Sequence, residues 1–211
     1  MNDPLARHFA DLPLIAILRG VTPAEAPAIG MALVEAGFRI VEVPLNSPEP
    51  LASIRGLVAA IGERATIGAG TVLAAAEVEA VAACGARLVV SPNTDPAVIY
   101  AAKAAGLATA PGVATPTEAF TAIAAGADLL KLFPAETLGP ATAKAWRAVL
   151  PAGTPLVPVG GVTPENVAAW RAAGAAGLGL GSAIYASGMP AAEVARRAQA
   201  FVAAWREAGT A

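Results

Sequence analysis

Cysteine and histidine are almost absent from this chain of 211 residues. The single cysteine, Cys84, cannot form an intrachain disulfide, and its Ala-rich surroundings favour a small buried hydrophobe. The single histidine, His8, lies in a mixed polar and apolar segment, so we expect it at the surface. One histidine and one cysteine are too few for a zinc site of the usual nitrogen and sulfur type. We expect no disulfide framework, no metal site and no cofactor.

Charge is also sparse, because only 14% of the residues are charged and the net charge is −2. A chain without a positive field is a poor candidate for nucleic-acid binding. The longest uncharged stretch, residues 172–192, contains five glycines and a proline, so it does not suit a membrane-spanning helix. Asp3, Arg7 and Asp11 are spread through the start, unlike the pattern of a secretory leader. We therefore expect a cytoplasmic protein that binds neither nucleic acid nor membrane.

Glycine, in contrast, recurs along the chain at intervals of 20 to 27 residues. Each of these glycines lies between an Ala-rich or amphipathic stretch and a short apolar run, as expected where a left-handed glycine ends a helix before a strand. The seven positions are Gly37, Gly62, Gly85, Gly106, Gly126, Gly153 and Gly174. Seven helix-to-strand junctions predict eight strands.

The eight predicted strands are continuous apolar runs, which is typical of parallel strands covered on both faces. They span residues 14–18, 40–43, 66–70, 87–91, 107–111, 129–133, 156–159 and 177–180. Eight βα units predict an α/β fold, a (β/α)8 TIM barrel forming one domain over residues 1–211, with an extra N-terminal helix over residues 2–11. The rival, an open doubly wound sheet, usually has a Gly-rich dinucleotide turn after its first strand. Residues 19–22 do not supply that turn.

Lys131 is unusual because it lies inside an apolar run, residues 129–133, that we expect to be a buried strand. Of three lysines in the chain, the other two, Lys103 and Lys144, lie in helix-like stretches where a charge can face water. Burial lowers the pKa of a lysine and favours its neutral, nucleophilic amine. Lys131 is therefore a candidate Schiff-base lysine. On this segment alone it could equally be a strand-end lysine that faces solvent or pairs with a carboxylate.

Two more charged residues, Arg19 and Glu42, belong to the ends of predicted apolar strands. The active sites of barrels lie at the carboxyl ends of the strands, so both side chains should project toward the same mouth as Lys131. Imine chemistry needs an amine, a carboxylate that moves protons, and a cation that binds a substrate acid. Glu42 and Arg19 could instead be structural partners of Lys131 and of each other.

Glycine-rich segments follow the seventh and eighth predicted strands, at Gly160-Gly161 and Gly181-Ser182. In barrels these two positions often form a phosphate site from backbone N–H groups. Together with Lys131 they predict a phosphorylated keto compound whose carbonyl lies at the lysine.

At these residues the chain resembles the 2-keto-3-deoxy-6-phosphogluconate and 2-keto-3-deoxy-6-phosphogalactonate aldolases, over residues 12–208. These are Schiff-base pyruvate aldolases on a (β/α)8 barrel. The similar motifs are Ile15-Ala16-Ile17-Leu18-Arg19-Gly20, Val41-Glu42-Val43-Pro44-Leu45-Asn46-Ser47-Pro48, Ile67-Gly68-Ala69-Gly70-Thr71-Val72, Ser91-Pro92-Asn93, Leu130-Lys131-Leu132-Phe133-Pro134 and Val159-Gly160-Gly161-Val162.

The resemblance implies a role for each matching residue. Lys131 would form the imine and Glu42 would shuttle protons. The residues implied in substrate binding are Arg19 and Thr71 at the carboxylate, Pro92 in its strand-end motif, Phe133 beside the imine, Val159 near a substrate hydroxyl, and Gly160, Gly161, Gly181 and Ser182 at the phosphate. The resemblance also implies a homotrimer without a metal, with pyruvate and glyceraldehyde 3-phosphate as products.

Two departures bear on which sugar acid is cleaved. The gluconate type typically has Thr before the Gly-Gly pair and Arg after the glutamate strand, where this chain has Val159 and Asn46. Both departures resemble the galactonate branch. We therefore expect 2-dehydro-3-deoxy-6-phosphogalactonate as the substrate. Alternatives are the gluconate epimer, 4-hydroxy-2-oxoglutarate, or a phosphosugar-binding barrel without catalysis.

Overall fold

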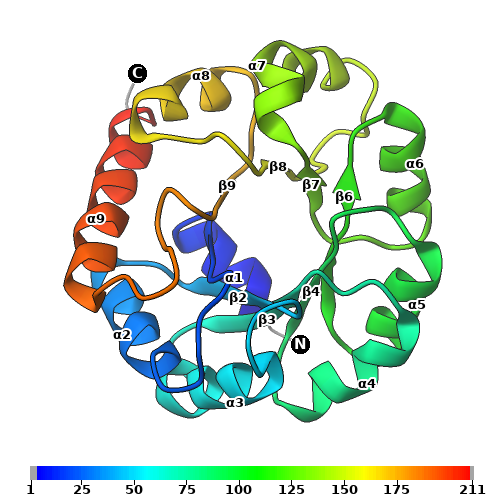
Figure 1. Cartoon of the computed structure of the whole chain (residues 1–211). Coiled ribbons are helices and arrows are strands. Elements are labelled where there is room, and N and C mark those ends of the chain that lie inside the picture. The colour runs from blue at the N-terminus through cyan, green and yellow to red at the C-terminus, as the bar shows by residue number, and fades with distance from the viewer. Residues whose placement is uncertain (1–3, 210–211) are drawn as a thin grey trace.

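The computed structural model describes residues 4–209, and its strands are parallel and form a curled arrangement with helices outside (Figure 1). The strands are β1 Leu14–Ile17, β2 Ile40–Pro44, β3 Thr66–Gly70, β4 Leu88–Val90, β5 Ala108–Ala110, β6 Gly112–Val113, β7 Leu130–Leu132, β8 Leu156–Pro158 and β9 Leu178–Leu180. Each of the eight predicted runs contains a strand. The α/β class and the parallel strands are confirmed.

Helices alternate with the strands along the chain. They are α1 Pro4–Asp11, α2 Ala26–Ala36, α3 Pro50–Ile61, α4 Ala75–Ala83, α5 Pro96–Ala104, α6 Pro116–Ala124, α7 Ala135–Trp146, the 3₁₀ helix η1 Pro164–Asn166, α8 Val167–Ala172 and α9 Ala191–Glu207. The start predicted at Asn2 for the first helix lies outside the described residues. Within residues 4–209, no helix is long and apolar enough to cross a membrane.

The strands form two hydrogen-bonded sheets, whereas the sequence predicts a single barrel of eight strands. One sheet has the order β5-β4-β3-β2-β1-β9, and the other has the order β6-β7-β8. The fifth predicted strand, residues 107–111, contains β5, and a further short strand that was not predicted, β6, begins after Pro111, since proline has no N–H to continue a ladder. The Lys131 N–H still bonds to the Pro111 carbonyl across this gap (2.9 Å). At the other gap a single bridge joins Val159 to Gly179.

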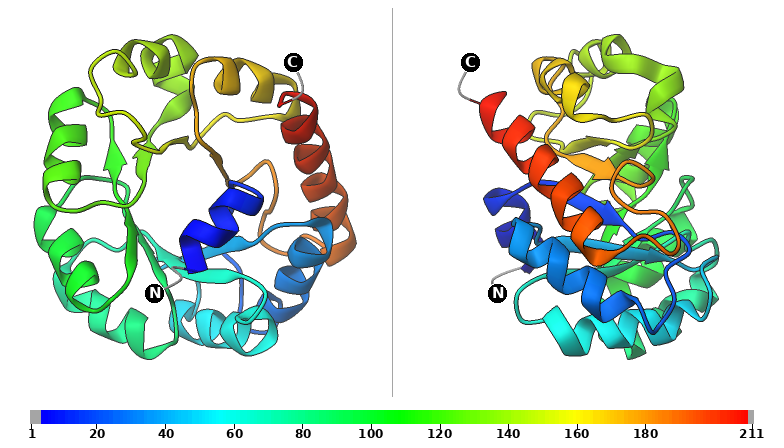
Figure 2. Two further views of the ribbon diagram at one scale, coloured as in Figure 1. Left: turned by 180° about the vertical axis from the view of Figure 1, so that it is seen from behind. Right: turned by 60° about the vertical axis from the view of Figure 1, so that its left-hand side comes forward.

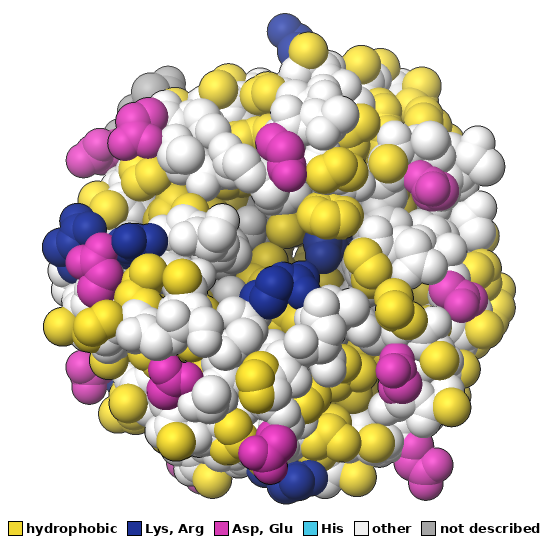
Figure 3. Space-filling view, viewed as in Figure 1, with side chains coloured by type: hydrophobic (Ala, Val, Ile, Leu, Met, Phe, Trp, Pro, Cys, Tyr) yellow, Lys and Arg dark blue, Asp and Glu magenta, His cyan; other side chains and the backbone are white. Residues whose placement is uncertain are grey.

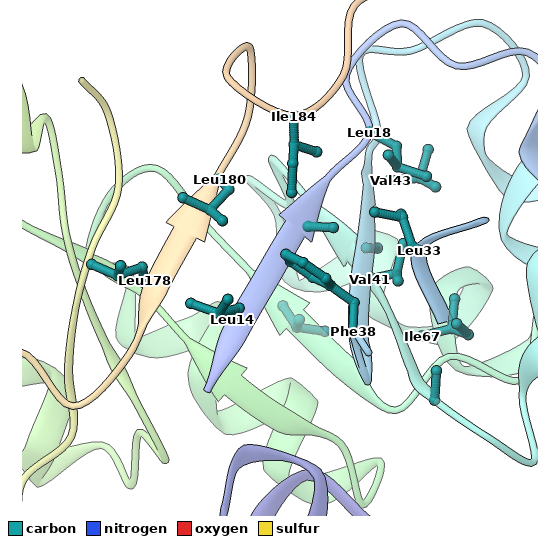
Figure 4. Packing of buried hydrophobic residues seen from close by; sticks show 14 of the residues in the cluster. Leu14, Leu18, Leu33, Phe38, Val41, Val43, Ile67, Leu178, Leu180 and Ile184 are labelled. Atoms are coloured by element: carbon teal, nitrogen blue, oxygen red, sulfur yellow. The ribbon is translucent and has the colours of Figure 1, made fainter. Parts of the chain in front are cut away.

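Alternate side chains of each strand enter two different apolar clusters. Leu14, Ala16 and Leu18 pack outward against helices, in the cluster shown in Figure 4. Ile15 and Ile17 belong instead to an inner cluster, surrounded by the strands. Burying one Leu or Ile side chain stabilises the fold by roughly 1.5–3 kcal/mol. The inner cluster also makes the space between the strands apolar, so that burying a charged side chain there costs desolvation free energy.

Helix α1 lies across the side of the curled sheets that is turned away from the viewer in Figure 1 (Figure 2). Its Leu5 joins the inner cluster. The expectation that His8 lies at the surface is wrong, because His8 is only 6% exposed and its Nδ1 is 2.9 Å from the Thr66 hydroxyl. Burial lowers the pKa of His8. His8 therefore points from α1 toward Thr66, the first residue of β3.

Six of the seven recurring glycines have a positive φ, as the helix-ending prediction requires. Gly62 is the exception, with φ −61. The chain continues in a right-handed turn there, since the N–H groups of Arg64 and Ala65 both bond to the Ile61 carbonyl. Cys84 is buried as predicted, at 5% exposure.

Candidate active site

Lys131 lies in the middle of β7 and is only 8% exposed. Its Nζ is 4.6 Å from the centre of the Phe133 ring, a cation–π distance. Burial lowers the pKa of the amine, while the nearby Glu42 carboxylate raises it and Arg19 lowers it further. The strand therefore holds a lysine whose neutral, nucleophilic form is favoured, as the sequence predicts.

Glu42 lies on β2 and is 2% exposed. Its Oε2 has no hydrogen-bond partner among the described residues. Burial raises the pKa of this carboxyl to about 7, although Lys131 and Arg19 both act to lower it. A side chain at Gly70 would collide with the Glu42 carboxylate, so the glycine of β3 provides the space that Glu42 fills. A carboxyl with this pKa can both donate and accept a proton near neutral pH.

Two hollows meet at Lys131. The smaller is enclosed and mostly apolar, and both Glu42 and Lys131 line it. The larger is an open cleft of about 600 Å³ that begins at Lys131. Ile17, Val159 and Gly179 line both hollows. Lysine and arginine atoms lie in the hollow at the middle of the face in Figure 3, and the cations that line the cleft are Arg19 and Lys131.

The far end of the cleft is lined by the segments that follow β8 and β9. Gly160, Gly161, Gly181 and Ser182 all line it, so the structure brings these four predicted residues together. Gly160 and Gly161 have φ of 109 and 64, which L side chains rarely adopt. A Cβ on Gly160 would also collide with the Glu136 carboxylate, and one on Gly161 would lie 2.7 Å from the Glu136 Cβ. The backbone conformation favours glycine at both positions, and an added Cβ would in addition displace the exposed Glu136 side chain of α7.

The remaining predicted residues occupy different positions around the mouth. Phe133 and Val159 line the cleft beside Lys131, and Val159 is 8% exposed. Thr71 and Pro92 follow β3 and β4, are half-buried, and do not line the cleft. Thr71 has φ 55, a left-handed conformation that is uncommon for a β-branched residue and is found mainly where surrounding structure imposes it.

Several residues at the site were not predicted from the sequence. The Asn46 side chain accepts a hydrogen bond from the Arg19 guanidinium (2.6 Å), and the Ser47 hydroxyl accepts one from the Gly20 N–H (3.0 Å). Tyr185 lines the cleft from the loop after β9. A role for Asn46 could have been predicted, because it follows the strand that carries Glu42. Tyr185 could not have been predicted, since a lone aromatic residue in a loop does not indicate what it contacts.

Three comparisons with known proteins extend over most of the chain. The family model for KDPG and KHG aldolases matches residues 6–200. The 2-dehydro-3-deoxy-6-phosphogalactonate aldolase of Escherichia coli (strain K12) is 53% identical over 189 residues, covering 90% of this chain and 92% of the relative. The native KDPGal structure is 52% identical, with a TM-score of 0.93, and the match covers 95% of this chain and 97% of that chain.

A further solved structure is a cube-shaped, highly porous protein cage designed by fusing symmetric oligomeric domains. Its chain is also 52% identical and has a TM-score of 0.93. The match covers 94% of this chain and 74% of that chain. All nine strands and all the predicted site residues fall within the range matched by the family model.

Proposed function

The chain belongs to the KDPG and KHG aldolase family, and we propose that it cleaves 2-dehydro-3-deoxy-6-phosphogalactonate to pyruvate and D-glyceraldehyde 3-phosphate. It is a lyase of the aldolase type. The observation that carries the proposal is the pairing of a buried amine, Lys131, with a buried carboxyl, Glu42, in one hollow at the base of a cleft. The relatives at 52–53% identity support the galactonate substrate.

The first step joins substrate and enzyme through Lys131. The neutral amine attacks the 2-keto carbon, and the carbonyl oxygen takes up a proton to give a carbinolamine. Loss of water then leaves a protonated imine. Glu42, with a pKa of about 7, supplies the proton that the departing hydroxyl needs. The inner apolar cluster favours the neutral amine before attack and keeps competing water away from it.

The second step breaks the carbon–carbon bond between C3 and C4. A base removes the proton of the C4 hydroxyl, the C3–C4 electrons move to the imine, and glyceraldehyde 3-phosphate leaves. The enamine that remains takes a proton at C3, and water releases pyruvate and the free lysine. Glu42, protonated or ionised with similar ease near neutral pH, serves both as this base and as this acid.

The two acidic ends of the substrate need separate sites. At the near end, Arg19 provides a guanidinium that can bind the carboxylate through two N–H groups, with Thr71 and Pro92 after β3 and β4 at the same end of the strands. At the far end, the backbone N–H groups of the segments after β8 and β9 bind the phosphate, and the Ser182 hydroxyl adds a donor. Phe133 packs beside the imine, 4.6 Å from Nζ.

Val159 governs the choice between the two C4 epimers. Val159 lines the cleft beside Lys131, where a threonine would offer a hydroxyl. A site without that donor gives no preference to the gluconate configuration. Activity on the gluconate epimer, or on 4-hydroxy-2-oxoglutarate, is the second candidate. Comparing kcat/KM for the two C4 epimers and for 4-hydroxy-2-oxoglutarate decides between them, and a preference for either of the alternatives would overturn the main proposal.

We also propose that the two sheets form one (β/α)8 barrel closed at its base by the first helix, in a single domain of residues 1–211. The backbone bonds across both gaps between the sheets support this closure.

A homotrimer is proposed because Leu73, Tyr100 and Phe120 leave large apolar groups exposed on successive units, which a neighbouring subunit would cover. Light scattering after size-exclusion chromatography tests the trimer. A cytoplasmic location follows from the phosphorylated substrate, which does not cross a lipid bilayer unaided.

A further inference from the structure

Two hydrogen bonds join the loop after β1 to the loop after β2. The Arg19 Nη1 donates to the Asn46 Oδ1 at 2.6 Å, and the Gly20 N–H donates to the Ser47 hydroxyl oxygen at 3.0 Å. Ser47 is buried at 7% exposure, whereas Arg19 and Asn46 are exposed. The Arg19 guanidinium, which lines the cleft, thus contacts Asn46, while Ser47 holds the backbone of the next residue, Gly20.

The turn that carries Asn46 is itself held in place. The Ser47 N–H bonds to the Pro44 carbonyl (2.9 Å), which closes the turn at the end of β2. The Leu45 N–H bonds to the Gly70 carbonyl of β3 (2.7 Å). Because Pro44 is two residues after Glu42, the turn also has a fixed relation to the proton shuttle. Asn46 therefore presents its amide from a rigid support.

The chemistry of the contact explains why an amide suits this position. Arginine only donates hydrogen bonds, so Asn46 must present its carbonyl oxygen. That oxygen is neutral, which leaves the full charge of Arg19 and its other N–H groups available to an anion. A carboxylate here would orient the guanidinium equally well but would also neutralise it. Arg19 acts electrostatically on both Glu42 and Lys131, so its charge matters to the whole site.

We propose that Asn46 is a positioning residue that holds the Arg19 guanidinium toward the substrate carboxylate without neutralising it, with Ser47 fixing the adjoining backbone. The inference rests on the proposed function, in which Arg19 binds that carboxylate.

A double-mutant cycle tests the proposal in the condensation direction, with pyruvate and glyceraldehyde 3-phosphate as substrates. We expect Asn46→Ala to raise the KM for pyruvate about fivefold with kcat nearly unchanged, and Asn46→Asp to raise it about 20-fold. In an Arg19→Gln background, Asn46→Ala should have almost no further effect, because the group it acts through is gone. Asn46→Asp should keep only the small effect of an added negative charge, comparable with that of the control variant below. Thermal unfolding of the single variants checks that each is folded.

Asn93→Asp provides the matched control. Asn93 is exposed and follows β4 at the same end of the strands, so it adds the same charge away from the Arg19 contact. Its effect should be similar in both backgrounds. The inference is overturned if Asn46→Asp leaves the KM for pyruvate unchanged, or if the Asn46 effects persist in full without Arg19. Absence of wild-type condensation would instead overturn the proposed function, so the two failures can be distinguished.

Discussion

The two ends of the cleft use different parts of the polypeptide. At the Lys131 end, charged side chains lie within an apolar layer, and burial moves the pKa of Lys131 downward and that of Glu42 upward to about 7. At the Gly160 end, the cleft is lined by the segments after β8 and β9, where Gly160 and Gly161 have a positive φ. Under the proposed function, reactivity at the first end depends on desolvation of Lys131 and Glu42, and phosphate affinity at the second depends on the backbone conformation.

Removing the amine should have the largest effect. We expect Lys131→Ala to lower kcat by roughly 10⁴-fold or more, as happens when a covalent nucleophile is lost. Lys144→Ala is the matched control, because Lys144 is an exposed lysine on the helix that follows β7. That control should keep its activity within about twofold. Steady-state cleavage assays measure both, and substantial turnover by Lys131→Ala would show that the reactive end lies elsewhere.

Replacing the carboxyl should have the next largest effect on activity. We expect Glu42→Gln to lower kcat by roughly 10²- to 10³-fold, because an amide cannot move the protons. The wild-type rate profile should contain a limb near pH 7 that the residual activity of Glu42→Gln lacks. A limb that is still present in the variant would assign the titration to another group.

The same substitution should reveal the stability cost of the reactive end. The pKa of Glu42 rises from its ordinary value of 4.5 to about 7, so the folded state binds the extra proton between these values. Stability therefore falls as pH rises from about 4.5 to 7 and levels off above. At 1.36 kcal/mol per unit this amounts to ~3 kcal/mol. Glu42→Gln should gain more in Tm over wild type at pH 8 than at pH 5.

The phosphate end can be disturbed through its backbone. We expect Gly160→Ala to raise KM for the phosphorylated aldehyde by roughly 10- to 100-fold, because φ 109 is strained for alanine and the Cβ meets Glu136. The KM for unphosphorylated glyceraldehyde should change little. Gly106→Ala is the matched control, since Gly106 also has a positive φ but an added Cβ meets nothing within 4 Å. An equal effect on both aldehydes would contradict a phosphate role.

The smallest effect should come from the residue between the two ends. We expect Val159→Thr to shift the kcat/KM ratio of the two C4 epimers about fivefold toward gluconate, because it adds one hydroxyl to the cleft wall. Kinetics with both epimers on wild type and variant measure the shift. An unchanged ratio would show that Val159 does not set the preference between the two epimers.

The two ends also differed in how well the sequence predicted them. Lys131 and Glu42 were visible because a charged side chain in an apolar strand is unusual, and the structure places both in one hollow. The glycines at the far end are predicted from their place after the last two strands and, for Gly160 and Gly161, from the motif that resembles the aldolase family. The contact between Glu136 and Gly160 was not predictable, since it depends on how α7 packs on a turn that follows a different strand.

The fold was predictable for similar reasons. Regular spacing of helix-ending glycines and apolar runs located the strands, because both patterns are local. The separate short strand β6 after Pro111 and the burial of His8 depend on tertiary contacts that a pattern along the chain does not contain. Bounds of individual elements therefore moved by one or two residues, while the order of the units did not change.

The proposed function depends most on a Schiff base between Lys131 and the keto group of the substrate. Borohydride reduction in the presence of pyruvate, followed by peptide mass mapping, detects this bond, because reduction makes the adduct permanent. We expect one pyruvate-derived label per chain, on the peptide that contains Lys131, and none on Lys103 or Lys144. An active enzyme that gains no label, or gains it on either of those two lysines, would show that Lys131 is not the Schiff-base residue.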